Sequence, residues 1–539
     1  MRDSVTLVEG IRIGKDKMMF MTDRRDSFRL RGPHAIFVMR FLIFLLAFVF
    51  LQGAVLPKTL ASEAGEDFAR EASALEKQGL YSQAIEQYAE AIPMLLAEGN
   101  EELAAACSES TETLAIIMGT YPYTLANIKD LIRETYPEAT DDQISEWTSS
   151  DSVHTWFYEG EVHYFDDTVA NLPYRYLDLM FENEASQTTY EQLVADVLAI
   201  DAAQPTDGFA QYSKPATYRG IHTISMPREA LPETGELRIW LPVPINTGPQ
   251  TGVVIESVTP EEWLVLPPSI NQDIGLAYFE VPLADLTDDL FIELSFVFTH
   301  YEQHVNVNPD LVGEYDRESA LYRQYTSSFG NTEITAEIRG KAEEIAGGEP
   351  NPYYAARALH DYIVDNVAYC FMPHSTFYPR TDLTESDYVH RTQQGDCGAQ
   401  SMYFSAMCRA LGIPARSTGG WQLFAGEYGG HFWAEFYLPN YGWVPVDTSF
   451  GQMADFAETV SEEDRSAFKN FSFASQDSMR CVVQKDTDLP LIPAAEGMVL
   501  LPMALQMPAA EYSMPASDLT EIRILEYWTL TCENLQGGE

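Results

Sequence analysis

The sequence predicts an α+β protein of several domains: a helical, repeat-like N-terminal region, a β-sandwich-like domain and a mixed α+β core. The chain has 539 residues, which at roughly 100–200 residues per domain corresponds to three or four domains. Its hydrophobic pattern changes from a helical to a strand period near residue 215, and the helical period returns near Ile334. Hydrophobic residues make up 46% and aromatic residues 12%, which excludes a largely disordered chain. The expected divisions are 1–61, 62–205, 215–305, 330–455 and 456–539.

Residues 1–61 form a basic leader. The first 60 residues carry 10 Lys or Arg and 5 Asp or Glu, whereas the whole chain has 33 and 81 and a formal charge of −48. Directly after Arg40, residues 41–51 form an apolar run that is typical of a signal-peptide core and short for a membrane span. The tripeptide Thr-Leu-Ala at 59–61 offers a cleavage site. We therefore expect export to the cell envelope or beyond, with the leader either removed or retained as a membrane anchor.

The segment 62–205 is expected to be helical. Ala84, Tyr88 and Ala91 recur at spacings of four and three, which is a helical stripe. Together with Gly79 and Tyr81 they resemble the second half of a tetratricopeptide (TPR) repeat. An ordinary helical hairpin explains the same pattern, because repeat arrays need about three units to bury a core. On either interpretation this region would serve as a spacer or bind a protein partner.

The segment 215–305 shows five strand-like runs separated by Pro, Gly, Asn and Asp, at 221–226, 237–241, 253–258, 276–281 and 290–298. Short strands at such spacing predict an antiparallel sandwich or half-barrel. Within them, residues 240–244 read Trp-Leu-Pro-Val-Pro. Because proline cannot donate to a sheet ladder, this stretch is predicted to lie at an edge. After residue 456 the pattern weakens into a β or irregular extension.

The chemistry of the chain is expected to centre on Cys397. A helix is predicted to begin at this residue, because Asp396 before it is a good N-cap. In the first turn, unpaired backbone N–H groups and the helix dipole should stabilise a thiolate and lower the pKa of Cys397. Small neighbours such as Gly395 would let a substrate carbonyl approach. Gly398 and Gln394 are assigned to the pocket that would hold the oxyanion or the substrate.

His431 and Asp447 supply a base and a carboxylate downstream. His431 begins a predicted strand 34 residues after Cys397, and Asp447 ends the next strand 16 residues later. A tight turn at 439–442 predicts that the two strands pair antiparallel, which brings both side chains close together. The order is then nucleophile, base and orienter. Trp433 is assigned to the pocket wall or to the core.

These blocks resemble the transglutaminase-like superfamily of papain-like cysteine enzymes, in its bacterial and archaeal secreted type. The matching sequences are Gly-Asp-Cys-Gly at 395–398, Arg-Ala-Leu-Gly-Ile-Pro-Ala-Arg at 409–416, His-Phe-Trp-Ala-Glu at 431–435 and Gly-Trp-Val-Pro-Val-Asp at 442–447. The resemblance implies a papain-like fold for the core, with Cys397 as nucleophile, His431 as general base and acid, and Asp447 as orienter. It also implies thioester chemistry on peptide or protein amides, by hydrolysis or acyl transfer. A catalytically inactive scaffold is the alternative.

Other classes of function find no support in the sequence. The excess of acidic residues repels nucleic acid, and neither a phosphate-binding loop nor a dinucleotide fingerprint is present. The six cysteines contain no C-x-x-C pair, and His300 and His304 lack a metal-ligand spacing. We therefore expect no metal, cofactor or nucleic-acid partner. Pairing of Cys481 with Cys532 in an exported chain stays open.

Overall fold

The structure is a computed structural model that describes residues 11–14, 64–150, 153–202, 211–424, 427–496, 506–512 and 524–536. The apolar run at 41–51 and the cleavage site at 59–61 lie outside the described residues. No helix within the described ranges is long and apolar enough to cross a membrane. The chain divides into two compact units: residues 19–115 with 157–161, and residues 1–18, 116–156 and 162–539.

The described part of the smaller unit consists mainly of helices. The stripe of Ala84, Tyr88 and Ala91 is its buried face. Tyr81 stacks on Tyr158 at a ring-centroid distance of 5.5 Å, which ties residues 157–161 to the helices of this unit. The resemblance to a tetratricopeptide repeat stays a prediction. The helices are α3 (Ala64–Glu76), α4 (Tyr81–Glu98) and the first part of α5 (Glu101–Thr120).

Short helices and a small sheet of order β2-β4-β3 follow α5 in the chain. Capping boxes start α6 at Thr124 and α7 at Thr140. The sheet was not expected, because strands of two to four residues are too short to show an alternating pattern. The elements are β2 (Tyr123–Thr124), α6 (Leu125–Thr135), α7 (Asp141–Ser149), β3 (Thr155–Tyr158), β4 (Glu161–Tyr164), α8 (Leu172–Arg175), α9 (Leu177–Phe181) and α10 (Glu184–Ala202).

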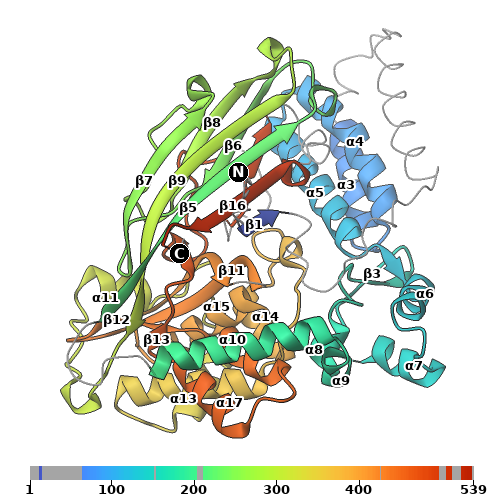
Figure 1. Ribbon diagram of the computed structural model, residues 1–539. Helices are drawn as coiled ribbons and strands as arrows, with labels where there is room; N and C mark the ends of the chain where they lie inside the picture. The colour runs from blue at the N-terminus through green and yellow to red at the C-terminus, as the bar shows by residue number, and fades with distance from the viewer. Residues whose placement is uncertain are drawn as a thin grey trace, which may run out of the picture. The chain divides into compact units, whose positions relative to one another are not determined.

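Two antiparallel sheets form the predicted β-rich region. One has the order β1-β16-β5-β9-β13 with β7 paired to β9, and the other has the order β15-β6-β8. Their inner faces share one hydrophobic core, to which Ile224 and Phe296 contribute from the first sheet and Ile239 and Phe279 from the second. Figure 1 shows β5 to β9 as a stack of long, twisted strands. The strands are β1 (Ile11–Gly14), β5 (Tyr212–Met226), β6 (Glu236–Pro242), β7 (Gln250–Thr259), β8 (Leu276–Pro282), β9 (Leu290–His304), β13 (Ser475–Gln476), β15 (Ala509–Tyr512) and β16 (Trp528–Asn534).

The predicted edge at residues 240–244 is wrong. Strand β6 pairs with β8 on one side and with β15 on the other, so it is the central strand of its sheet. Pro242 is the last residue of β6, and a proline is tolerated there because no backbone N–H is needed to continue the strand pairing beyond it. The missing signal was β15, which comes from a C-terminal segment with no clear strand pattern.

The α+β core contains a four-stranded antiparallel sheet of order β12-β11-β10-β14. Helix α15 packs against β10 and β11 (Figure 1). A second hydrophobic core lies between these elements and α12 and α13, with Leu359, Phe404 and Phe436 fully buried in it. The elements are α11 (Ala320–Tyr325), α12 (Ala336–Ala346), α13 (Pro352–Asn366), α14 (Glu385–Thr392), α15 (Cys397–Ala410), β10 (Ala415–Phe424), β11 (Glu427–Leu438), β12 (Gly442–Val446), α16 (Thr448–Gln452), α17 (Glu462–Phe471) and β14 (Arg480–Gln484).

Strand β14 links the sheet of the α+β core to the β-rich region. It pairs with β10, while Cys481 and Val483 are part of the hydrophobic core between the two β-sheets. The Val482 carbonyl accepts the Ile245 N–H at 3.0 Å, which joins β14 to the segment after β6. Cys532 lies in the same core as Cys481, and both are free thiols. The β-sheets and the α+β core are therefore joined through β14.

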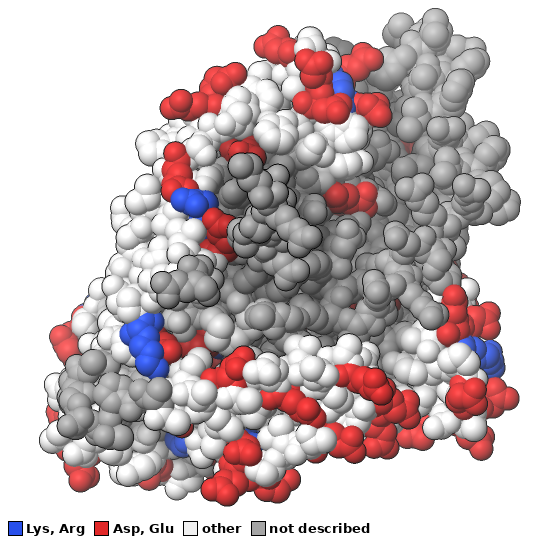
Figure 2. Space-filling model, viewed as in Figure 1, with Lys and Arg blue, Asp and Glu red and all other residues white. Residues whose placement is uncertain are grey.

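Asp and Glu outnumber Lys and Arg on the visible surface. Figure 2 shows many acidic residues and few Lys or Arg on this face, with acidic residues gathered over α10. This agrees with the formal charge of −48.

Candidate active site

Cys397 is the first residue of α15, and the helix begins there because Asp396 caps it. Asp396 has an extended backbone, and its Oδ1 accepts the Ala399 N–H at 2.9 Å. Of the six cysteines, only Cys397 is partly exposed, since the other five are buried. The cysteine that the sequence singles out is therefore the least buried of the six.

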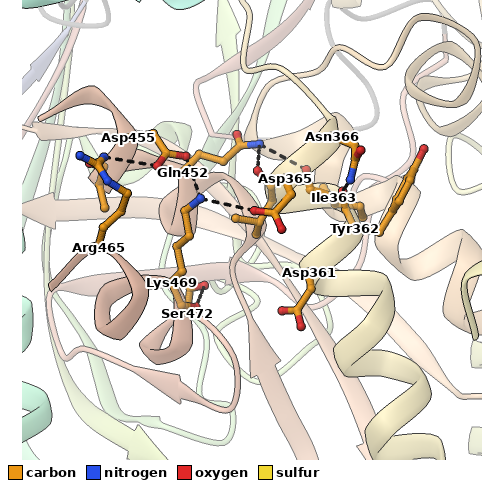
Figure 3. A network of polar contacts seen from close by, with 12 residues as sticks. Asp361, Tyr362, Ile363, Asp365, Asn366, Gln452, Asp455, Arg465, Lys469 and Ser472 are labelled. Atoms are coloured by element: carbon orange, nitrogen blue, oxygen red, sulfur yellow. Dashed lines mark hydrogen bonds and ion pairs between the residues drawn. The ribbon is translucent and has the colours of Figure 1, made fainter. Parts of the chain in front are cut away.

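A buried amide pair holds the first turns of α15. Gln400 Nε2 donates to the Gly395 carbonyl and to Gln452 Oε1, both at 2.9 Å. Gln452 is the last residue of α16, and its Nε2 donates to carbonyls at the end of α13, including that of Val367 at 2.5 Å. In Figure 3 the Gln452 side chain extends toward this end of α13. Helix α15 is thus fixed to two neighbouring helices.

Ion pairs brace the same corner from α17. Lys469 Nζ lies 3.4 Å from Asp365 and 3.0 Å from Asp455, so it bridges α13 and the segment after α16. Arg465 contacts Asp455 from the other side at 3.3 Å (Figure 3). These contacts lie behind the site and support it mechanically.

His431 and Asp447 lie side by side. Strands β11 and β12 pair antiparallel, with Ala434 opposite Val446, as the turn predicted. His431 Nε2 is 2.8 Å from Asp447 Oδ2, and each residue is only 3% exposed. Asn440, in the connecting turn, has the positive φ of 75° that Asn tolerates. The pair is therefore preorganised and shielded from water.

Asp447 is bound by more than the imidazole. Its Oδ1 accepts the Phe450 N–H at 3.1 Å, which caps α16. Its Oδ2 also accepts from Arg480 Nη1 at 2.5 Å. Burial alone would raise the pKa of Asp447, but His431 and Arg480 outweigh it and hold that pKa well below its usual range.

Arg480 and Asp477 are the site residues that the sequence analysis missed. Arg480 is 1% exposed, donates from Nε to Asp477 Oδ2 at 2.9 Å, and lies over the rings of Trp433 and Phe450 at 5.1 Å each. A signal did exist: an arginine at the head of an apolar strand needs a buried anion. Its partner could not be read from the sequence.

The thiol of Cys397 differs from its prediction. Burial, followed by the charge of Asp396, raises the pKa of Cys397 well above its usual range, although the backbone N–H groups of Phe432 and Gly398 oppose this. The predicted lowering is therefore wrong for this structure, because desolvation outweighs the helix terminus. The contact with the Phe432 N–H places the sulfur beside the residue that follows His431. No hydrogen bond joins Cys397 to His431 among the described residues, so the triad as a working unit stays a prediction.

The three tentative pocket residues have different positions. Gln394 is buried, and its Oε1 accepts from Arg175 Nη2 at 3.0 Å. Gly398 is buried in the first turn of α15. Trp433 is 1% exposed, with its ring centroid 6.0 Å from that of His431, so it forms part of the interior wall. Roles for these residues in holding an oxyanion or substrate stay predictions.

The segment 116–202 also borders the site, although its sequence carries no recognisable motif. Arg175, at the end of α8, contacts Gln394 as described. Asn171 brackets the backbone of Phe371, accepting its N–H at 2.7 Å and donating to its carbonyl at 3.1 Å. His154 contacts the Tyr388 hydroxyl. The described residues contain no group of three or more His, Cys, Asp or Glu side chains that could hold a metal ion.

Part of this chain is similar in sequence to known proteins. A family model described as the Transglutaminase-like superfamily matches residues 339–448. An uncharacterized protein of Haemophilus influenzae is 28% identical over 165 residues, which cover 26% of this chain and 44% of that protein. A protein-glutamine gamma-glutamyltransferase of Pseudomonas aeruginosa is 27% identical over 123 residues, or 21% of this chain and 18% of that protein. The chain thus spans less than half the length of either relative.

Two solved structures show weaker likeness. That of a proposed cysteine protease from Cytophaga hutchinsonii has a TM-score of 0.32 and 14% identity, and covers 56% of this chain and 99% of its own. The periplasmic domain of TgpA from Pseudomonas aeruginosa has a TM-score of 0.24 and 15% identity, and covers 48% and 100%. Both scores are too low to define a common overall architecture. The region 339–448, which contains Cys397, His431 and Asp447, therefore matches a transglutaminase-like domain.

Proposed function

We propose that this chain is an exported cysteine enzyme that acts on amide bonds of peptides or proteins. The observation that carries the proposal is the buried His431–Asp447 bond of 2.8 Å beside the start of α15, where Cys397 is the one partly exposed cysteine of the six. An imidazole fixed by a carboxylate next to a thiol is what base-assisted thiol attack requires. Export is supported by the apolar run at 41–51, and recovery of the chain from the cytoplasmic fraction alone would contradict it.

Acylation would begin at the sulfur. Because burial favours the neutral thiol of Cys397, His431 would take its proton as the sulfur attacks the amide carbonyl and the carbon–sulfur bond forms. Asp447 would hold the resulting imidazolium. The oxyanion would accept the N–H of Cys397, which as the first helical residue has no carbonyl to bond within its own helix. The carbon–nitrogen bond would then break, with the His431 proton passing to the leaving amine.

Resolution of the thioester would decide the reaction type. Attack by water, deprotonated by His431, gives a carboxylic acid and restores the thiol. Attack by a primary amine gives a new amide instead. The Pseudomonas aeruginosa relative is named a protein-glutamine gamma-glutamyltransferase, which makes glutamine side chains the first substrates to try.

A catalytically silent scaffold is the second candidate. The observation that favours it is the raised pKa of Cys397 together with the absence of a Cys397–His431 hydrogen bond among the described residues. In that case the domain would bind peptides without turning them over.

Turnover separates the two candidates. The full chain would be incubated with a glutamine-containing peptide and a labelled primary amine, and the products read by mass spectrometry. Incorporated amine indicates transfer, while released ammonia or a cut backbone indicates hydrolysis. Cys397→Ala and His431→Ala should each lower the rate by about 10²–10⁴-fold, because nucleophile and base are then missing.

Cys408→Ala is the matched control. Cys408 lies on the same helix, but it is fully buried, and its pKa is raised by burial. Its removal should leave turnover within about twofold, provided that the variant folds. Turnover that survives Cys397→Ala, or a wild-type chain that alkylates at Cys397 no faster than His431→Ala, would contradict the enzyme and favour the scaffold.

A further inference from the structure

His374 lies between two carboxylates at the start of the nucleophile helix. It opens the 3-10 helix η6 (His374–Thr376), in the loop between α13 and α14. Its Nε2 is 2.7 Å from Asp396 Oδ2, and its Nδ1 is 2.7 Å from Glu385 Oε1. Asp396 caps α15, while Glu385 is the first residue of α14 and its side chain is completely buried. The ring therefore connects the starts of two helices. We call these three residues the His374 cluster.

The contacts determine the charge of the ring. A neutral imidazole donates from one nitrogen only, whereas both nitrogens of His374 face carboxylate oxygens, so the doubly protonated ring satisfies the geometry. Burial opposes this charge, but Asp396 and Glu385 outweigh it and hold the pKa of His374 well above its usual range. Burial likewise opposes ionisation of Asp396, but His374 and the N–H groups of Ala399 and Gly398 outweigh it and lower the pKa of Asp396.

Asp396 matters to the chemistry because it directly precedes the nucleophile. After burial, its charge is the largest influence that raises the pKa of Cys397. A carboxylate needed as a helix cap thus works against negative charge at the sulfur. An imidazolium 2.7 Å from that carboxylate offsets its field, and in a poorly solvated interior such an offset is large.

We propose that His374 is a positioning residue: it orients and neutralises Asp396, so that the start of α15 can accommodate negative charge on the Cys397 sulfur and on the tetrahedral intermediate. This inference rests on the proposed function, in which Cys397 is the nucleophile. His374 acts only through Asp396 and does not itself contact the reacting atoms.

Other titratable groups face the cluster from the elements around it. His154 belongs to the segment 116–202, Tyr369 and Cys370 to the loop after α13, Tyr388 to α14, and Asp488 follows β14. Burial lowers the pKa of His154 to about 4 and raises those of Tyr369, Cys370 and Tyr388. Burial also raises the pKa of Asp488 to about 6, so Asp488 is the charged member of this group near neutral pH, and it is the same in wild type and in every variant below.

The test is the rate of Cys397 alkylation by iodoacetamide in the full chain at a series of pH values from about 7 to 10, below the raised pKa of the thiol. The Cys397 peptide is quantified by mass spectrometry in wild type, His374→Gln, Asp396→Asn and the double variant. His374→Gln should lower this rate about tenfold across the series, because the charge of Asp396 is then unopposed. In the Asp396→Asn background, where Asn still caps the helix, the same substitution should leave the rate unchanged.

Two results would overturn the proposal: an unchanged alkylation rate in His374→Gln, as a purely structural role predicts, or an equal loss of rate in both backgrounds. His374→Lys is the second variant, since it keeps a cation near the carboxylates. It should hold the alkylation rate near that of wild type even where His374→Gln does not fold, and a rate lowered about tenfold would again overturn the proposal.

Failure of the proposed function would look different. His431→Ala would then alkylate at Cys397 like wild type, and no peptide would be turned over, whatever His374→Gln does. If the chain is active, His374→Gln should also lower kcat about tenfold with KM unchanged. A change in KM alone would count against a role in the chemical step.

Discussion

Two histidines near Cys397 each contact a carboxylate at less than 3 Å, yet the balance of charge around them is opposite. His374 bridges the two carboxylates of the His374 cluster, each at 2.7 Å. His431 contacts the single carboxylate of Asp447 at 2.8 Å, and Arg480 binds that same oxygen. His374 therefore carries the positive charge that balances its two carboxylates, whereas the guanidinium of Arg480 carries the charge that balances Asp447.

The difference explains why similar pairs suit different tasks. A histidine that is the cation for two carboxylates keeps its proton and serves to fix structure. A histidine whose carboxylate is already satisfied by arginine can gain and lose a proton without leaving a buried anion alone. General acid–base chemistry needs the second arrangement.

Removing the guanidinium of Arg480 should abolish the difference between the two histidine sites, and it should have the largest effect on stability. Arg480→Met leaves Asp447 and Asp477 buried without their cation, so the free energy of unfolding should fall by about 3–5 kcal/mol. Urea unfolding followed by circular dichroism at neutral pH measures the loss. Lys485→Met is the control: it removes a partly exposed bridge to Asp273 of 2.8 Å, and should cost about 1 kcal/mol or less. Equal losses in the two variants would contradict the assigned role of Arg480.

The pH dependence of stability should sharpen the contrast through opposite signs. The pKa of Asp447 is lowered, so its contribution is present above the unfolded value of about 3.9 and is lost as pH falls. The pKa of His374 is raised, so its contribution is complete below about 6.5 and is lost as pH rises through the folded value. Relative to wild type, Asp447→Asn should flatten the acid side of the stability curve and His374→Gln the alkaline side, each by about 1–3 kcal/mol. Curves that change on the same side would refute the assignment.

Glu385→Gln should leave His374 with a single carboxylate, as at His431, and it should have the smallest effect on stability. The amide can still accept from Nδ1, so stability at neutral pH should change by about 1 kcal/mol. With one carboxylate gone, the ring should lose its proton earlier, and the alkaline loss of stability should begin about one pH unit lower. Glu333→Gln is the control. Glu333 accepts from the hydroxyl of Thr384, directly before the same helix, and its replacement should leave the pH range of the alkaline loss of stability unchanged. If the alkaline loss of stability began at a higher pH than in wild type, the result would contradict the bridging geometry.

Local signals in the sequence predicted the parts of the site that depend on neighbouring residues. The cap at Asp396 placed Cys397 at the start of α15, and the turn at 439–442 predicted the antiparallel pairing that joins His431 to Asp447. The five strands of the β region were also found at their predicted positions. Period and turn chemistry are short-range properties, so one sequence is enough to read them.

What the sequence did not predict depends on long-range packing. Arg480 reaches Asp447 because β14 pairs with β10, and no local pattern specifies that partner. His374 reaches Asp396 through the path of a loop that is held by Asn171, two hundred residues upstream of Phe371. The pKa of Cys397 was mispredicted for a similar reason, because the helix terminus is a local effect while burial is a property of the whole fold.

Strand β14 has a consequence for how this chain can vary. The matched family region ends at residue 448, but Arg480, which binds Asp447, lies beyond it, on a strand whose other side chains fill the core between the neighbouring β-sheets. A shortening or shift in the C-terminal extension would therefore leave the Asp447 carboxylate without its guanidinium as well as disturb packing. The structural unit that holds His431 and Asp447 in place is thus larger than the region that matches the superfamily.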